Sequence, residues 1–61
     1  MDLKKARNRC MSKAYAFARA GNARWAQVWI DRAAMHWPVG PQQLTHANRL
    51  LREAHDADTT T

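Results

Sequence analysis

The chain lacks the disulfides and metal-binding motifs that usually stabilise a very small protein. It contains one cysteine, Cys10, so no disulfide can form within the chain. Its three histidines, His36, His46 and His55, are ten and nine residues apart, a spacing that zinc fingers do not use. A chain of 61 residues forms at most one small domain, whose core rarely supplies more than about 3–5 kcal/mol. We therefore expect association, either as a homodimer or with a target that stabilises the fold.

Long apolar runs are also missing. No stretch of about 18 apolar residues occurs, so we expect no membrane span and no membrane partner. The first residues do not form an apolar segment followed by a cleavage site, and so they give no indication of secretion. The expected location is the cytoplasm.

Acidic residues are scarce. There are five Asp and Glu against ten Lys and Arg, which gives a formal net charge of +5. Residues 1–20 contain six of the basic residues and only one acidic residue, Asp2. An acidic protein surface or a nucleic acid is therefore the natural partner of the first third of the chain.

The two glycines and two prolines are few, and they fall where helices would begin or end. Asp2 is a suitable N-cap for a first helix over about residues 3–20. Gly21 can adopt the left-handed conformation that often ends a helix, and Asn22 can cap a second helix over about 23–37. A turn this short predicts an antiparallel helical hairpin.

A third, short helix is expected after the second. Pro38 disfavours helical geometry at the residue before it, and Pro41 suits the first position of a helix over about 41–56. Acidic residues near the end of this helix oppose its dipole, so its last turn should fray and residues 59–61 should form a disordered tail. No alternating pattern persists long enough for a strand, which predicts an all-α fold with a single domain over residues 1–58.

Apolar residues recur at helical spacing in all three segments. The first stripe consists of Leu3, Ala6, Cys10, Ala14 and Phe17, widened by Met11, Tyr15 and Ala18. The second consists of Ala26, Ala33 and Trp37, flanked by Ala23, Trp29, Ile30 and Ala34. The third consists of Leu44, Ala47, Leu51 and Ala54, with Leu50 and Ala57 beside it. We expect Phe17, Trp29 and Trp37 to supply most of the buried area, because aromatic side chains are the largest.

The hairpin resembles a tetratricopeptide repeat. That pattern has an aromatic residue on its first helix, a turn glycine, then alanine, a large apolar residue, a small residue and a final proline. The matching residues are Phe17, Gly21, Ala26, Ile30, Ala33 and Pro38. The resemblance implies a helical hairpin. It covers one repeat, whereas a stable array normally has at least about three.

Part of the same segment resembles small helical anti-activators. Ala18–Gly21, followed by Ala26, Trp29 and Ala33, is similar to the ANR family (AraC negative regulators) and to the quorum-sensing anti-activator proteins of transposable phages, and 47–49 partly matches a second family signature. The resemblance implies a non-enzymatic protein that binds a transcription activator and blocks its DNA binding or dimerisation. If the gene belongs to a phage, the resemblance implies action in the host bacterial cytoplasm.

Residues suited to catalysis or to a cofactor are few. Cys10 lies on the expected core stripe, where a buried apolar role is more typical than that of a catalytic thiol. Asp31 and Glu53 are each next to an arginine, which favours ion pairing in solvent. His46 and His55 are expected on the helix surface, and no glycine-rich phosphate loop occurs. We therefore expect no catalytic, metal-binding or cofactor-binding site.

The outer side of the second helix has more large apolar residues than a solvated surface requires. Trp25, Val28 and Met35 are predicted to point away from the core face. Either the third helix or the N-terminal segment covers them as core, or they form an interface, for which Trp, Met and Arg are typical. The candidate partner-binding residues are Arg24, Trp25, Val28, Asp31, Arg32 and Met35.

A basic ridge is predicted on the first helix. Lys5, Arg9 and Lys13 are spaced by four residues and share one face. The ridge is compatible with a solvated face, with an acidic protein partner or with nucleic-acid phosphates. No helix-turn-helix recognition helix and no aromatic RNA-binding signature accompanies it.

These observations favour a small regulator that is not an enzyme and that binds and inhibits a larger protein, with a bacterial transcription activator as the expected target. The alternative is a small basic DNA- or RNA-binding protein that acts through the basic ridge. A small enzyme or metal protein ranks last.

Overall fold

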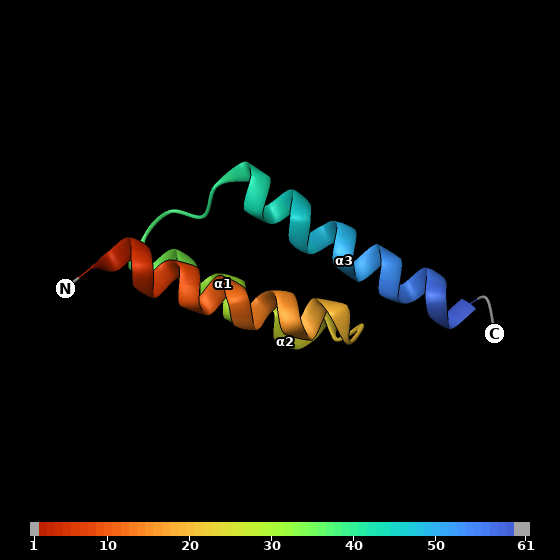
Figure 1. Cartoon of the computed structure of the whole chain (residues 1–61). Coiled ribbons are helices and arrows are strands. Elements are labelled where there is room, and N and C mark those ends of the chain that lie inside the picture. The colour runs from red at the N-terminus through yellow and green to blue at the C-terminus, as the bar shows by residue number, and fades with distance from the viewer. Residues whose placement is uncertain (1, 60–61) are drawn as a thin grey trace.

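The computed structural model describes residues 2–59, and this part of the chain consists of three helices without a strand. They are α1 (Leu3–Arg19), α2 (Ala23–His36) and α3 (Pro41–Thr59). Figure 1 shows α2 returning antiparallel to α1, and α3 then running in the same direction as α1. The predicted all-α fold, a hairpin followed by a third helix, is confirmed.

Helix boundaries agree with the sequence to within one residue at the turn and differ most at the end of α3. Trp37 has φ −160° and ψ 145°, so α2 ends at His36. The extended conformation at Trp37 is the one that a following proline favours. At the other end, α3 continues to Thr59, beyond the expected end near residue 56. The expected tail thus loses Thr59 to α3, and residues 60–61 lie outside the described residues.

The turn of the hairpin has a well-defined hydrogen-bond pattern. Gly21 has φ 77°, the left-handed conformation that suits glycine. Its N–H donates to the Ala18 carbonyl (3.0 Å), and the Asn22 N–H donates to the Phe17 carbonyl (2.9 Å). These two bonds form a Schellman motif, which satisfies carbonyls at the end of α1. The Asn22 Oδ1 then accepts from the Trp25 N–H (3.1 Å) and caps α2.

The beginning of α1 is capped as predicted. Asp2 is extended, and its Oδ1 accepts a hydrogen bond from the Lys5 N–H at 3.1 Å. This contact satisfies one of the free N–H groups of the first turn and places a negative charge at the positive end of the helix dipole.

The core is built mainly of alanine. The buried hydrophobic residues are Met11, Ala14, Ala18, Ala26, Ile30, Ala33 and Ala47. Met11, at 1% exposure, is the largest of the fully buried side chains. Small side chains allow α1 and α2 to approach closely, but they leave little room for large residues between the helices.

The aromatic residues consequently lie at the margins of the core, which differs from the prediction. Trp29 and Phe17 are half-buried, and Trp37 is 40% exposed. Trp37 leaves the helical face because its backbone is extended, and the predicted place of this residue on the core face is therefore wrong. Leu3 and Leu44, predicted on the apolar stripes, are also largely exposed.

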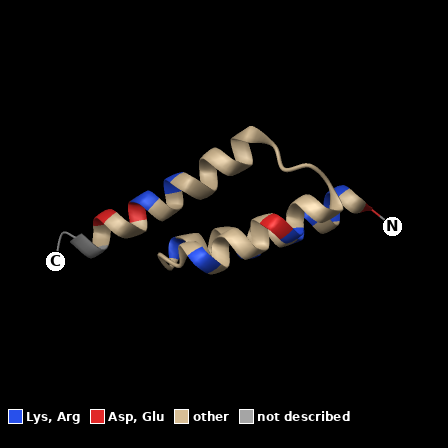
Figure 2. Ribbon diagram, turned by 180° about the vertical axis from the view of Figure 1, so that it is seen from behind, with Lys and Arg blue, Asp and Glu red and all other residues tan. Residues whose placement is uncertain are grey.

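An edge-to-face ring contact and hydrogen bonds of side chains link α1 to α3 and to the connection before it. The rings of Tyr15 and His46 meet edge to face, with centroids 4.8 Å apart. The Gln43 Nε2 donates to the Asn8 Oδ1 (3.3 Å), and the Arg7 Nη1 donates to the Pro38 carbonyl (2.8 Å) in the connection before α3. Of the residues of α3 whose side chains are described, Ala47 is the one that is fully buried. Figures 1 and 2 show that the end of α3 extends past the hairpin turn.

No helix in the described part of the chain combines the length and the apolar character that crossing a membrane requires.

Candidate functional site

The outer side of α2 exposes large apolar side chains. Met35 is 85% exposed and Trp25 is 48% exposed, while Val28 is half-buried. The sequence left open whether α3 or the beginning of the chain covers these residues. Neither encloses Trp25 or Met35. Arg24, Asp31 and Arg32, the remaining predicted partner-binding residues, are exposed as well.

The three apolar residues lie on one side of α2 because of their spacing. At about 100° per residue, Trp25, Val28 and Met35 fall within roughly 80° of the helix circumference. Trp25 and Met35 are ten residues apart, so they are separated by about 15 Å along the helix axis. The exposed apolar side is therefore an elongated strip rather than a compact patch.

Trp25 is supported by a residue of α1. The rings of Phe17 and Trp25 are stacked, with centroids 6.0 Å apart and planes inclined by 26°. This contact extends the apolar strip from α2 across the boundary to α1. The sequence predicted Phe17 in the core, so the contribution of this residue to the surface was not predicted.

Trp29 connects the strip to two cations. The Lys13 Nζ lies 4.9 Å from the centroid of the Trp29 ring, and the Arg32 guanidinium carbon also lies 4.9 Å from it. Each cation–π contact at such an exposed position is worth about 0.5–1 kcal/mol. The indole thus lies next to both cations at the boundary between α1 and α2.

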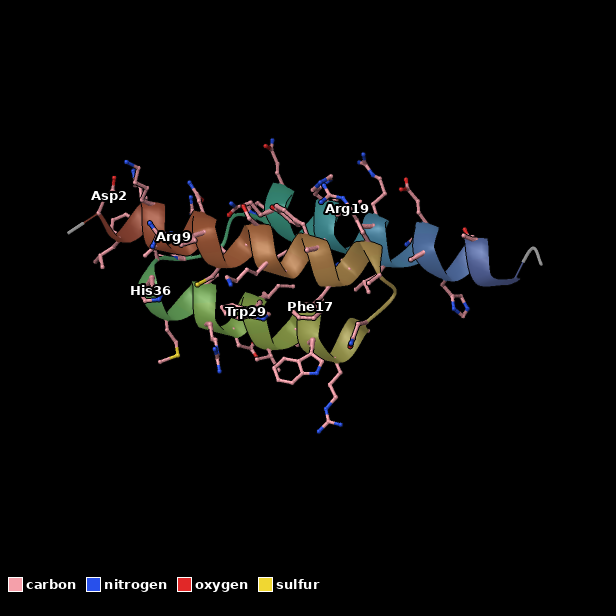
Figure 3. All side chains as sticks on the ribbon, turned by 60° about the horizontal axis from the view of Figure 1, so that its bottom comes forward. Asp2, Arg9, Phe17, Arg19, Trp29 and His36 are labelled. Atoms are coloured by element: carbon pink, nitrogen blue, oxygen red, sulfur yellow. The ribbon has the colours of Figure 1, made fainter. Side chains whose placement is uncertain are left out.

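We call the set Lys13, Phe17, Trp25, Trp29 and Arg32 the aromatic–cationic seam. Figure 3 shows Phe17 and Trp29 between the ribbons of α1 and α2, whereas Arg19 lies on the opposite side of α1. The spacing of four residues between Trp25 and Trp29, and of three to Arg32, is the sequence pattern that points to this surface.

Asp31 lies on the exposed side of α2, at the edge away from Trp29. Its Oδ1 accepts a hydrogen bond from the Gln27 Nε2 at 2.9 Å, one turn earlier in the same helix. The carboxylate thus has a polar partner of its own and does not lie at the seam.

The predicted basic ridge on α1 is exposed, but its members differ in their surroundings. Lys5, Arg9 and Lys13 are all exposed. Lys13 turns toward Trp29 and joins the seam. Arg7, a basic residue of α1 outside the ridge, donates from its Nε to the Asn8 Oδ1 (3.0 Å) and from its Nη1 to the Pro38 carbonyl.

A third cation–π contact lies at the open end of the hairpin. The Lys4 Nζ is 5.2 Å from the centroid of the Trp37 ring. Leu3, 43% exposed, is also at this end, because α1 begins where α2 stops. This end is separate from the seam, since Trp29 lies two turns earlier on α2.

The remaining chemical groups are placed as follows. Cys10 is half-buried and packs against the core cluster. Burial raises the pKa of Tyr15, an effect that the nearby Arg7 charge partly offsets. Within the described residues, no three His, Cys, Asp or Glu side chains come together as a metal site would require. A hollow lined by Thr45, Asn48, Arg49 and Arg52 is formed by α3 alone, without a wall from a second element.

Comparisons with protein-family models, with curated proteins and with solved structures give no significant match.

Proposed function

We propose that this chain is a non-enzymatic protein-binding regulator that uses the outer side of α2 to bind and inhibit a larger protein. The observation that supports this function is the exposure of Trp25 and Met35 on one side of a helix whose other side forms the core. Tryptophan, methionine and arginine are the residue types enriched in the centres of protein interfaces.

Burial of the apolar strip against a partner would contribute binding energy. Burying a fully exposed side chain of the size of methionine contributes about 1.5–3 kcal/mol, and Trp25, about half exposed, has a comparable area left to bury. These gains are reduced by the cost of association.

The proposed target is a bacterial transcription activator. Support for this choice comes from the resemblance to anti-activator families, which rests on Ala18–Gly21, Ala26, Trp29 and Ala33. These residues form the end of α1, the turn and the inner half of α2, next to the exposed strip. Binding there would block the DNA-binding or dimerisation surface of the activator. The proposed location is the bacterial cytoplasm, and the proposed process is quorum sensing or a related regulatory circuit. Phage origin is part of the same proposal.

Homodimerisation is a further part of the proposal. The core contains one large fully buried side chain, Met11, and leaves several large apolar residues exposed. A core of this size supplies little stability on its own, and association would add to it. Sedimentation at micromolar concentration tests this directly, and a stable monomer would contradict it.

Affinity capture from a bacterial lysate tests the binding function. The wild-type chain should retain a discrete protein, identified by mass spectrometry, and Trp25→Ala or Met35→Ala should weaken its capture. Leu3→Ala is the matched control, because Leu3 is comparably exposed (43%) but lies at the other end of the hairpin from Trp25. Equal capture by all four chains would reject the α2 surface. A reporter gene driven by the captured activator then tests inhibition.

The second candidate function is binding to DNA or RNA. It is favoured by the exposure of Lys5 and Arg9 on one face of α1. The affinity for duplex DNA should then fall with salt, with a log–log slope of roughly −0.9 per neutralised phosphate. Charge reversal at both residues should abolish nucleic-acid binding but only slow the capture of a protein. No mobility shift at low salt would eliminate this candidate.

A further inference from the structure

The aromatic–cationic seam combines apolar rings with fixed positive charge. Lys13 and Phe17 come from α1, whereas Trp25, Trp29 and Arg32 come from α2, so the surface exists only in the folded hairpin. Both cations lie over the ring of Trp29, and therefore any ligand that contacts the indole edge also meets positive charge. The complementary ligand has apolar side chains with carboxylates beside them.

A second copy of the chain does not provide this complement. A two-fold contact centred on the seam would bring the Lys13 and Arg32 of one copy toward the same cations of the other. Like charges placed together at an interface cost free energy. The nearest acidic residue of α2, Asp31, is on the far edge and accepts from Gln27.

Nucleobases fit the seam less well than protein side chains do. A base stacks on an open aromatic face. Trp29 already has two cations over its ring, and one face of Trp25 lies against Phe17. An aliphatic or aromatic side chain of a protein can instead pack against the exposed ring edges and against Met35. The thioether of Met35 is flexible and adapts to irregular apolar surfaces.

The dimensions of the exposed side indicate the form of the partner. From Trp25 to Met35 the strip runs for about 15 Å, which matches about three turns of a helix laid along it. Amphipathic helices bind apolar surfaces through residues at positions i, i+3 or i+4, and i+7. Acidic residues flanking such a stripe would face Lys13 and Arg32.

We propose that the seam, continued by Met35, binds an acidic amphipathic helix of the partner protein. This inference rests on the proposed function and specifies the chemistry of the partner. Apolar residues of the partner helix pack on Trp25, Trp29 and Met35, and its Asp or Glu side chains pair with Lys13 and Arg32. The charge gives selectivity and faster association, and the apolar contacts give most of the affinity.

Three synthetic helical peptides with the same leucine stripe test the proposal. One has Glu on both flanks of the stripe, the second has Gln and the third has Lys at the same positions. An oligo-dT probe is added as a fourth ligand. Indole N–H signals of the ¹⁵N-labelled chain, assigned by single substitutions, report separately on Trp25, Trp29 and Trp37.

The Glu peptide should shift the Trp25 and Trp29 signals and leave that of Trp37 unchanged. At about 0.05 M salt it should bind at least roughly tenfold more tightly than the Gln peptide, and this preference should shrink at about 0.5 M salt. The Lys peptide should bind most weakly. Lys13→Gln and Arg32→Gln should each reduce the Glu preference about threefold or more, while Lys5→Gln, an equal charge change away from the seam, should leave it intact.

Several outcomes would overturn the inference. Equal binding of the Glu and Gln peptides at Trp25 removes the acidic requirement but leaves the proposed protein-binding function standing. Indole shifts with oligo-dT and none with the peptides point to a nucleic acid and count against both proposals. Indole shifts caused by concentration alone identify a second copy as the occupant. No shift with any peptide rejects the acidic helix, and lysate capture then decides the function separately.

Discussion

The hairpin and the third helix are held in different ways. Six of the seven buried core residues belong to α1 and α2, and the turn between these helices has a Schellman motif and an N-cap. The third helix contributes Ala47 to the core and half-buries Leu50, Leu51 and Ala54. Its polar contacts with α1 include the Tyr15–His46 ring edge and the Gln43–Asn8 hydrogen bond. The hairpin therefore carries all residues of the seam, whereas α3 covers one side of the core through Ala47.

The largest effect is expected from Met11→Ala. Loss of this side chain leaves a cavity in the hairpin core and costs about 2–5 kcal/mol, comparable to the whole stability expected for a chain of this size. Urea unfolding followed by circular dichroism measures the change. Met35→Ala is the matched control, because Met35 is 85% exposed, and its effect should stay within about 0.5 kcal/mol. Similar losses for both variants would show that Met11 is not the centre of the core.

The two glycines give the next comparison, one in the hairpin turn and one in the connection to α3. Gly21→Ala should destabilise the chain by about 1–2 kcal/mol, because the left-handed conformation disfavours a side chain. Steric contact is a minor factor, since the new Cβ would lie 3.7 Å from the Ala54 Cβ. Gly40→Ala should be neutral or slightly stabilising, because the φ of Gly40 is not positive and an added Cβ would lie at an ordinary contact distance of 3.8 Å from the Gln43 Oε1. Thermal unfolding of both variants checks the difference.

A smaller and more local effect is expected from His46→Ala. The edge-to-face contact with Tyr15 is worth about 0.5–1.5 kcal/mol. Its loss should increase hydrogen exchange in α3 roughly two- to tenfold while α1 and α2 keep their protection. Arg49→Ala, on the exposed side of α3, serves as the control. Equal loss of protection in all three helices would mean that α3 and the hairpin open as one unit.

The smallest expected effect is the pH dependence of the stability contributed by Tyr15, the residue that contacts His46. Because burial raises the folded-state pKa of Tyr15, the folded chain holds this proton more tightly than the unfolded chain. The resulting stabilisation is fully present below the ordinary tyrosine pKa of about 10 and is lost as the pH rises through the higher folded-state value. The stability of the wild-type chain relative to Tyr15→Phe should therefore fall above about pH 10. A difference independent of pH would contradict the assignment.

Local chemistry made much of the fold predictable. Asp2, Gly21 and Asn22 act through contacts within a few residues, so their roles follow from the sequence directly. The later part of α3 was harder to predict, because helix propensity there outweighs the unfavourable acidic residues at its end.

The candidate site was only partly predictable. The exposed positions of Trp25 and Met35 follow from the helical period. The contribution of Phe17 and Trp29 does not, because both fall near the apolar stripe on a helical wheel. An alanine-lined interface is too narrow for large rings, and this close approach of α1 and α2 moves them to the boundary, where Lys13 and Arg32 contact Trp29.

The two described methionines differ in exposure by almost the full range, with Met11 at 1% and Met35 at 85%. Mild peroxide converts an accessible thioether to its sulfoxide and spares one that is enclosed. Intact-mass measurement and peptide mapping after such treatment can therefore measure the oxidation of Met35 and of Met11 separately in the same sample. Oxidation at Met35 follows occupancy of the outer side of α2, and oxidation at Met11 reports global opening of the chain.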